Sequence, residues 1–196
     1  MLFPLEKSLV VPDYPIFRLT VEQYHDMVDA GILTEDDPVE LLEGWLVTKM
    51  PKNPRHTLST QLTREALARV APSGWFVSDQ EPITTADSEP EPDIVVVHGD
   101  RRDYLERHPS LEDVALVVEV ADAMLQRDRT LKLRVYASAG IAVYWILNLV
   151  ERQLEVYSQP EESAYRQRRV YGESEEVPVV IGGREVGQVA VGEMLP

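Results

Sequence analysis

Residues 115–147, ALVVEVADAMLQRDRTLKLRVYASAGIAVYWIL, decide the fold of this chain. The runs 115–120 and 141–147 are apolar on both faces, which is typical of strands inside a sheet that helices cover. Between them, 127–139 is predicted to be a helix, and Gly140 is its expected left-handed stop. A strand, a helix and a strand in this order predict a right-handed parallel crossover, and hence an α/β fold.

Further strands are expected on both sides of this unit. Residues 75–77 and 93–97 are short apolar runs near turn-forming residues, and a strand is predicted at each. Residues 154–157 and the Val/Gly-rich tail 168–191 are predicted to be peripheral antiparallel strands, with Gly182-Gly183 as a hairpin turn. The sequence therefore predicts a mixed central sheet flanked by helices, with extra antiparallel strands at the C-terminus.

The N-terminal third carries helix signals. A capping box at Thr20 and Gln23 predicts a helix that ends near residue 31. The acidic stretch 35–42 predicts a short helical turn, and the pair Asn53-Pro54 begins another helix that is predicted to run to about residue 70. These elements predict one domain over residues 1–196, which comprises N-terminal helices (20–70), a core (75–158) and a peripheral β tail (159–196).

Composition and charge exclude several classes of protein. The chain has 196 residues, 44% of them hydrophobic and 27% charged, which is ordinary usage for a globular domain. It contains no cysteine, which excludes disulfide frameworks, thiol catalysis and Cys-containing zinc sites and suits a reducing compartment. Residues 1–7 lack the pattern of a signal peptide, and no window has the ~18 uninterrupted apolar residues of a membrane span. We therefore expect a cytoplasmic protein with no membrane partner.

Two acidic residues lie within predicted strands that are otherwise apolar. Asp93 opens the strand predicted at 93–97, and Glu119 lies near the end of the strand predicted at 115–120. If these strands pair antiparallel, both carboxylates lie on one face at one end of the sheet. Two buried anions need a positive partner, and hard oxygen ligands favour Mg²⁺ or Mn²⁺ over zinc.

The predicted crossover helix adds positive charge near these acids. Residues 126–134, QRDRTLKLR, hold four basic residues and one acid in a chain whose net charge is −15. Lys132 falls within the first turns of that predicted helix, where its long side chain could reach the two acids. Beside a metal-bound water, an ammonium can orient the nucleophile and stabilise charge on a phosphate oxygen. Arg127, Arg129 and Arg134 are candidates for binding the phosphate backbone.

Several motifs occur together in a recognisable order. Pro92-Asp93 is followed by Glu119-Val120 at the end of an apolar run, and then by the basic segment with Asp128 and Lys132. Other motifs are VELLEG at 39–44, PRH at 54–56, YASAG at 136–140 and YW at 144–145. From about residue 19 to residue 157, the chain resembles the Uma family of restriction-endonuclease-like proteins, within the PD-(D/E)XK nuclease superfamily.

The resemblance implies a restriction-endonuclease-like core and Mg²⁺-dependent hydrolysis of DNA phosphodiester bonds. It implies that Asp93 and Glu119 are metal ligands and catalytic residues, and that Lys132 is the catalytic lysine. Glu40, expected on the short helical turn, would be a further ligand or would contact one. His56, at a helix start, would be a structural residue or would contact a ligand.

The chain departs from the family pattern at two points. The lysine expected two residues after the acid is absent, because position 121 is Ala, so Lys132 would have to serve from the helix. The loop after Glu119 reads Ala121-Asp122-Ala123 where relatives usually carry a Ser-Pro-Ser-like stretch. Asp122 could be an additional metal ligand or a helix cap, or its presence could indicate that the activity has changed.

Each site residue also has an ordinary structural interpretation. Asp93 after Pro is a common strand-entry residue, and Glu119 could be an edge-strand charge that blocks aggregation. Lys132 could form an i,i+4 surface ion pair with Asp128. The three arginines, Arg127, Arg129 and Arg134, could form a solvated helix face.

The function therefore has three candidates. The first is a Mg²⁺- or Mn²⁺-dependent endonuclease acting on DNA, for which a homodimer would suit double-strand cleavage. The second is a non-catalytic interaction or regulatory module on a nuclease-like fold. The third is a small phosphoester hydrolase. The net charge of −15 opposes DNA binding, because an acidic surface repels phosphate backbones.

Overall fold

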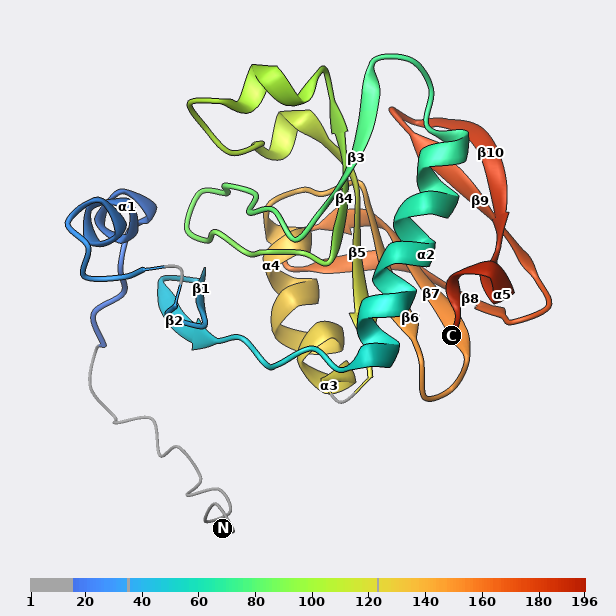
Figure 1. Cartoon of the computed structure of the whole chain (residues 1–196), viewed down its shortest axis with the longest axis horizontal. Helices are drawn as coiled ribbons and strands as arrows, with labels where there is room; N and C mark the ends of the chain where they lie inside the picture. Colours follow the sequence, from blue (N-terminus) through green and yellow to red (C-terminus); the bar gives the residue numbers. More distant parts are fainter. Residues whose placement is uncertain (1–15, 35, 123) are drawn as a thin grey trace, which may run out of the picture.

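The computed structural model describes residues 16–34, 36–122 and 124–196 (Figure 1). The prediction about a signal peptide at residues 1–7 lies outside these ranges. Glu35, in the stretch 35–42, and Ala123, in the loop 121–123, also lie outside them, so the predictions are not assessed at these two residues.

A six-stranded mixed sheet forms the centre of the fold (Figure 1). In spatial order its strands are β3 (Trp75–Asp79), β4 (Ile94–His98), β5 (Val114–Ala121), β6 (Val143–Asn148), β7 (Gln153–Glu161) and β8 (Ala164–Gly172). β5 and β6 pair in parallel, and the other neighbours in this sheet pair antiparallel. The predicted strand–helix–strand unit with parallel strands is therefore confirmed, as is the mixed α/β fold class.

A helix with a π-helical turn connects β5 to β6. It consists of α3 (Leu125–Arg127), the π-helical turn η3 (Asp128–Lys132) and α4 (Leu133–Ser138). The prediction of a helix here is confirmed, with its start two residues earlier than expected. π-helical turns are rare in proteins, and those that occur often lie at functional sites. This segment is therefore a candidate location for a functional site.

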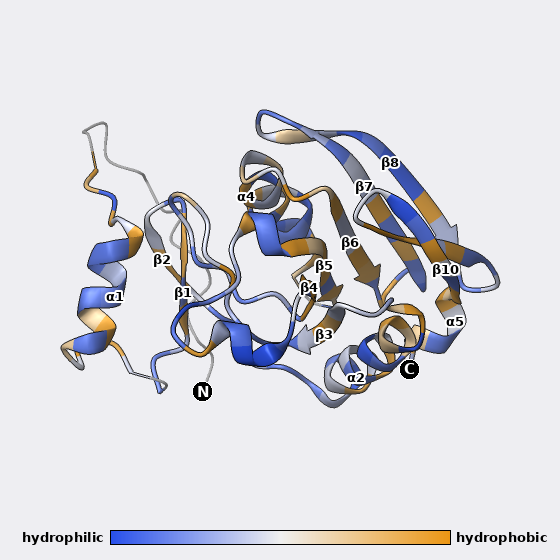
Figure 2. Ribbon diagram, turned by 90° about the horizontal axis from the view of Figure 1, so that it is seen from above, coloured by the Kyte–Doolittle hydropathy of each residue, from blue (hydrophilic) through white to orange (hydrophobic). Residues whose placement is uncertain are grey.

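The two faces of the sheet are covered by different elements (Figures 1 and 2). On one face pack α2 (Pro54–Val70), the hairpin of β9 (Glu176–Ile181) and β10 (Arg184–Ala190), and α5 (Val191–Met194). On the other face pack α4 and the hairpin of β1 (Val39–Leu42) and β2 (Trp45–Thr48), through residues such as Leu42, Val135 and Tyr136. Alternate residues of β4 enter the two cores: Ile94 and Val96 enter the first, Val95 and Val97 the second. Burial on both faces explains the continuous apolar runs.

The C-terminal strands are less peripheral than expected. β7 and β8 belong to the main sheet, and the boundary predicted between residues 158 and 159 falls inside β7. β7 pairs antiparallel with β6 on one side and with β8 on the other, so it is an inner strand of this sheet. Of the four strands β7 to β10, only β9 and β10 lie outside the main sheet, as a separate two-stranded sheet. The predicted hairpin turn at Gly182-Gly183 is confirmed by positive φ values of 57° and 76°.

The expected helical turn over 35–42 is wrong. Val39–Leu42 is strand β1, which pairs antiparallel with β2 (Trp45–Thr48), so Glu40 lies on a strand and not on a helix. The turn residues Glu43 and Gly44 have φ values of 50° and 78°, the left-handed pair that a two-residue hairpin turn requires. A Cβ at Gly44 would lie 2.6 Å from Arg18 Cβ, so this position also needs glycine for space.

The starts of α1 and α2 were predicted correctly. α1 (Val21–Asp29) has Thr20 as its N-cap and the predicted capping box with Gln23. α2 begins at Pro54, where the side chain of Asn53 accepts a hydrogen bond from the backbone N–H of His56. Two 3₁₀ turns, η1 (Arg101–Tyr104) and η2 (Leu111–Asp113), lie in the connection between β4 and β5. Within the described ranges, every helix is too short or too polar to cross a bilayer.

Candidate active site

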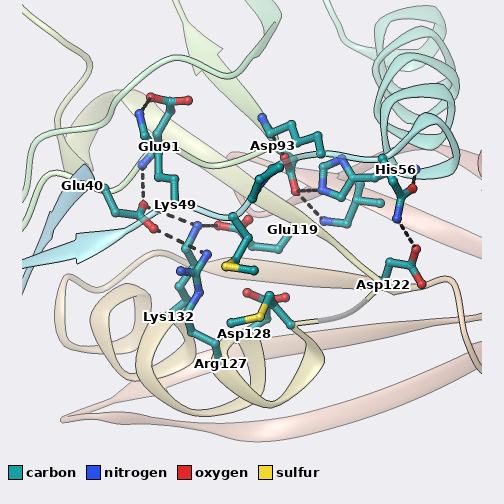
Figure 3. A pocket seen from close by; sticks show the side chains of 16 residues that line it. Glu40, Lys49, His56, Glu91, Asp93, Glu119, Asp122, Arg127, Asp128 and Lys132 are labelled. Atoms are coloured by element: carbon teal, nitrogen blue, oxygen red, sulfur yellow. Dashed lines mark hydrogen bonds and ion pairs between the residues drawn. The ribbon is translucent and has the colours of Figure 1, made fainter. Parts of the chain in front are cut away.

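Asp93 and Glu119 lie side by side at one end of the sheet (Figure 3). The antiparallel register pairs Ile94 with Val118, so the next pair outward is Asp93 and Glu119. Both side chains are buried, with residue exposures of 5% and 4%. The two strands pair antiparallel, and Asp93 and Glu119 therefore lie on the same face at the same end of the sheet, as the sequence predicts.

These two carboxylates line a pocket of about 120 Å³, which is room for several water molecules. Elements distant in sequence form its wall, namely β1, the loop between β2 and α2, the start of α2, the ends of β4 and β5, and the crossover helix. Six carboxylates and four Lys or Arg side chains line it, so the carboxylates outnumber these cations by two. The ionisable members of the wall are Glu40, Lys49, Lys52, His56, Glu91, Asp93, Glu119, Asp122, Arg127, Asp128 and Lys132.

The carboxylate of Asp93 is held by neighbours that favour its charged form. Its Oδ2 accepts a hydrogen bond of 2.9 Å from the backbone N–H of Val120 and lies 3.1 Å from Nε2 of His56. Its Oδ1 lies 3.3 Å from Nζ of Lys52. Burial alone would raise the pKa of Asp93, but the contacts with His56, Val120 and Lys52 outweigh it, so the pKa lies below its usual value. Asp93 is therefore an anion at neutral pH.

Glu119 is in a different electrostatic situation. Its Oε1 accepts hydrogen bonds from Nζ of Lys132 at 2.8 Å and from the hydroxyl of Tyr136 at 2.6 Å. Burial raises the pKa of Glu119 to about 8; the charge of Lys132 opposes this rise and that of Asp93 adds to it. Glu119 therefore holds its proton up to about pH 8, unless a bound cation displaces it.

Lys132 is buried among acids. It is 3% exposed, and besides the contact with Glu119 its Nζ lies 3.5 Å from Oε2 of Glu40. Burial opposes the charged form, but Glu119, Glu40 and Asp128 raise the pKa of Lys132 above its usual value. The ammonium therefore stays charged in the physiological range, although it is removed from water.

Asp128 is a site residue for which the sequence analysis offered only an ion pair with Lys132. It is 4% exposed and lines the pocket, yet its carboxylate makes no hydrogen bond and no ion pair with any described residue. Burial raises the pKa of Asp128 to about 6, against the opposing charges of Lys132 and Arg127. The two residues would face each other at i,i+4 in a regular α-helix, but they both lie in η3, where Lys132 contacts Glu119 and Glu40 instead.

Glu40 joins this group from β1. It is 2% exposed, and its Oε2 accepts a hydrogen bond of 3.1 Å from the backbone N–H of Glu91. Its Oε1 is buried with no hydrogen-bond donor among the described residues; the nearest cation is Arg127, at 3.7 Å. Glu40 thus helps to hold Lys132 in place from a strand.

The remaining predicted residues are divided between the pocket and its surroundings. His56 lines the pocket and contacts Asp93. Asp122 also lines it, and its carboxylate accepts a hydrogen bond of 2.6 Å from Nδ2 of Asn53, which ties the loop after β5 to the start of α2. Lys49, Lys52 and Glu91 line the pocket although no sequence motif marked them.

Only one of the three candidate phosphate-binding arginines reaches the pocket. Arg127 lines it and donates a hydrogen bond of 3.0 Å to the carbonyl of Thr48. Arg129 is paired with Glu155, and Arg134 with Glu43. Neither Arg129 nor Arg134 lines the pocket, so the structure does not place them with Asp93 and Glu119.

The donor chemistry of the pocket suits a hydrated Mg²⁺ or Mn²⁺. No group of three Asp, Glu or His side chains in the described part of the chain is arranged as a metal cage. Mg²⁺, however, usually binds through one or two carboxylates and keeps several waters. Asp93 and Glu119 provide two carboxylates, the pocket has room for water, and a dication would balance the two carboxylates that the lining Lys and Arg side chains leave over once all six are ionised.

Comparisons with known proteins agree with the fold. The model of the Uma2 family, described as "Putative restriction endonuclease", matches residues 21–189. The crystal structure of a putative nuclease belonging to DUF820 from Anabaena variabilis has a TM-score of 0.65 at 16% identity, over 90% of this chain and 97% of that one. No functionally curated protein matches the chain. Since the family model covers most of its length, the chain belongs to the Uma2 family of putative restriction endonucleases.

Proposed function

We propose that this protein is a Mg²⁺- or Mn²⁺-dependent endonuclease that hydrolyses phosphodiester bonds in DNA. The observation that carries the proposal is the convergence of two buried carboxylates and a buried ammonium, those of Asp93, Glu119 and Lys132, in one pocket. A dication held by Asp93 and Glu119 would supply an activated water and neutralise charge on the phosphate. Membership of the Uma2 family supports the same reaction class.

The protein's own groups would orient the reactants. The His56 ring and the Val120 N–H hold Oδ2 of Asp93, which leaves Oδ1 for a cation. The Tyr136 hydroxyl and the Lys132 ammonium fix Oε1 of Glu119. The Lys132 ammonium is already positioned and charged, so it needs little reorganisation to hold the attacking water or a phosphate oxygen.

The phosphate would meet positive charge at the pocket itself. Lys49, Lys52 and Arg127 line it and can offer charge-assisted hydrogen bonds to phosphate oxygens. The net charge of −15 on the whole chain lowers non-specific affinity for DNA. We therefore expect affinity to depend on these few local contacts and on the cation.

One observation favours a second candidate, a hydrolase of small phosphoesters. The pocket measures about 120 Å³, and Arg129 and Arg134 are neutralised by acids outside it, so no basic track for a polymer continues from it along the crossover helix. The net charge of −15 also favours a non-catalytic interaction module, because an acidic surface repels DNA.

Metal titration followed by substrate assays tests the proposal. Calorimetry with Mn²⁺ and Mg²⁺ should show binding by the wild type that Asp93→Asn and Glu119→Gln remove. Plasmid, single-stranded DNA and a chromogenic phosphodiester should then be incubated with each cation. DNA cleavage that requires the cation and disappears in Lys132→Met is the expected result.

The other outcomes select among the candidates. Hydrolysis of the chromogenic diester without DNA cleavage would favour the small-phosphoester hydrolase. Absence of cation binding would favour the non-catalytic module. Circular dichroism of each variant shows whether a loss of activity comes from misfolding.

A further inference from the structure

Lys52 lies on the loop that connects β2 to α2, and it contacts the same carboxylate that is proposed to bind the metal. Its Nζ is 3.3 Å from Oδ1 of Asp93. The other oxygen, Oδ2, is taken by His56 and by the Val120 N–H. Within the described ranges no other hydrogen bond or ion pair reaches Oδ1. The oxygen left for a cation is therefore the one that Lys52 contacts.

Lys52 is far easier to move than Lys132, the buried lysine of the site. Its side chain is 32% exposed, whereas that of Lys132 is 4% exposed. A partly exposed ion pair is weak, because water competes for both partners and the long side chain loses rotamer freedom when it is held. A divalent cation carries twice the charge of an ammonium and binds carboxylate oxygen directly.

We propose that Lys52 occupies the cation position on Asp93 until a divalent ion displaces it, and that the released ammonium then contacts the substrate phosphate. The inference rests on the proposed function, since it concerns the same metal ligand. Lys52 lines the pocket, so its ammonium stays near the entering phosphate after it leaves Oδ1. Cation binding and phosphate binding are thereby coupled, and by linkage each strengthens the other.

Lys49 offers a matched control on the same loop. Its side chain is 33% exposed, it also lines the pocket, and its Nζ lies 2.8 Å from Oε2 of Glu91 rather than from Asp93. Neutralising either lysine removes one positive charge from the pocket. Only the loss of Lys52 frees an oxygen of Asp93.

Calorimetric titration with Mn²⁺ tests the displacement. Lys52→Met should bind Mn²⁺ at least threefold more tightly than the wild type, and Lys49→Met should change the affinity by a clearly smaller factor. Equal changes in the two variants, or no tightening in Lys52→Met, would overturn the proposal. If the wild type shows no Mn²⁺ binding that Asp93→Asn removes, the proposed function fails as well.

The affinity for a short DNA duplex, measured by fluorescence anisotropy with and without Ca²⁺, tests the phosphate contact. Ca²⁺ accepts the same oxygen ligands. The gain in DNA affinity that Ca²⁺ produces should be at least threefold smaller in Lys52→Met than in the wild type. An undiminished gain would overturn the phosphate contact even if the Mn²⁺ result is as expected.

Discussion

The Nζ atom of Lys132 lies 2.8 Å from Oε1 of Glu119, 13 positions away in the chain, and both side chains are buried. The pair joins the crossover helix to the end of β5, and both residues line the pocket. Coulomb attraction at this distance is strong once water is excluded, but the cost of removing two charges from water offsets most of it. The pair therefore matters chiefly through what happens when one partner is lost.

Lys132→Met should destabilise the fold by about 3–5 kcal/mol, because it leaves buried carboxylates without their cation. Glu119→Gln should cost less, since Glu40 Oε2 remains 3.5 Å from the ammonium. Urea unfolding at pH 7 in the presence of a chelator measures both. Arg152→Gln, which breaks the exposed ion pair with Glu173, is the control and should change little. A larger loss for Glu119→Gln than for Lys132→Met would contradict this ordering.

Asp128→Asn should stabilise the protein at alkaline pH. Burial raises the pKa of Asp128 to about 6 from 3.8, so the folded state holds a proton that the unfolded state releases between these values. Stability is therefore lost as pH rises from about 4 to about 6, by up to ~3 kcal/mol for this shift. Asparagine avoids that loss, so the variant should gain at pH 8 and not at pH 4.

Thermal melts at pH 4, 6 and 8 in a chelating buffer would measure this difference. Asp122→Asn is the matched control, because Asp122 lines the same pocket but its carboxylate is hydrogen-bonded to Asn53. A gain of equal size at every pH in Asp128→Asn would show that ionisation of Asp128 is not the cause.

Cation affinity should rise with pH until about pH 8. The pKa of Glu119 is raised to about 8, so below that value a divalent ion must displace its proton. The expected slope is about one tenfold gain in affinity per pH unit between pH 6 and 8, followed by a plateau. Mn²⁺ titrations at four pH values measure it. An affinity that stays constant between pH 6 and 8 would show that the cation displaces no proton from Glu119.

Gly44→Ala should disturb the hairpin that carries Glu40. The residue has φ of 78°, and its added Cβ would lie 2.6 Å from Arg18 Cβ and 2.9 Å from the Leu19 carbonyl oxygen. Gly74, with φ of 84° and no atom within 4 Å of a Cβ, is the control for backbone strain alone. Gly74→Ala should cost about 1–2 kcal/mol and Gly44→Ala clearly more, as measured by urea unfolding. Equal losses would mean that the close contact relaxes freely.

Local patterns predicted the central elements because their causes are local. The two-sided apolar runs of β5 and β6 and the helix between them follow from burial on both faces of a sheet. The alternation along β4 and β5 brought Asp93 and Glu119 to the same face and end. The stretch 35–42 misled the prediction, because acidic residues and Pro38 are compatible with a helix start, while the Glu43–Gly44 turn and its fit against Arg18 require a hairpin.

The sequence by itself determined the α/β fold, the strand carrying Asp93, the strand carrying Glu119 and the basic helix with Lys132. Tertiary structure alone decided the partners of the long charged side chains. Arg129 is neutralised by Glu155 and Arg134 by Glu43, whereas Lys52 reaches Asp93 from a loop. The physical reason is that backbone pattern follows short-range periodicity, while an ion pair depends on which distant chain segments the packed core brings within a few ångströms.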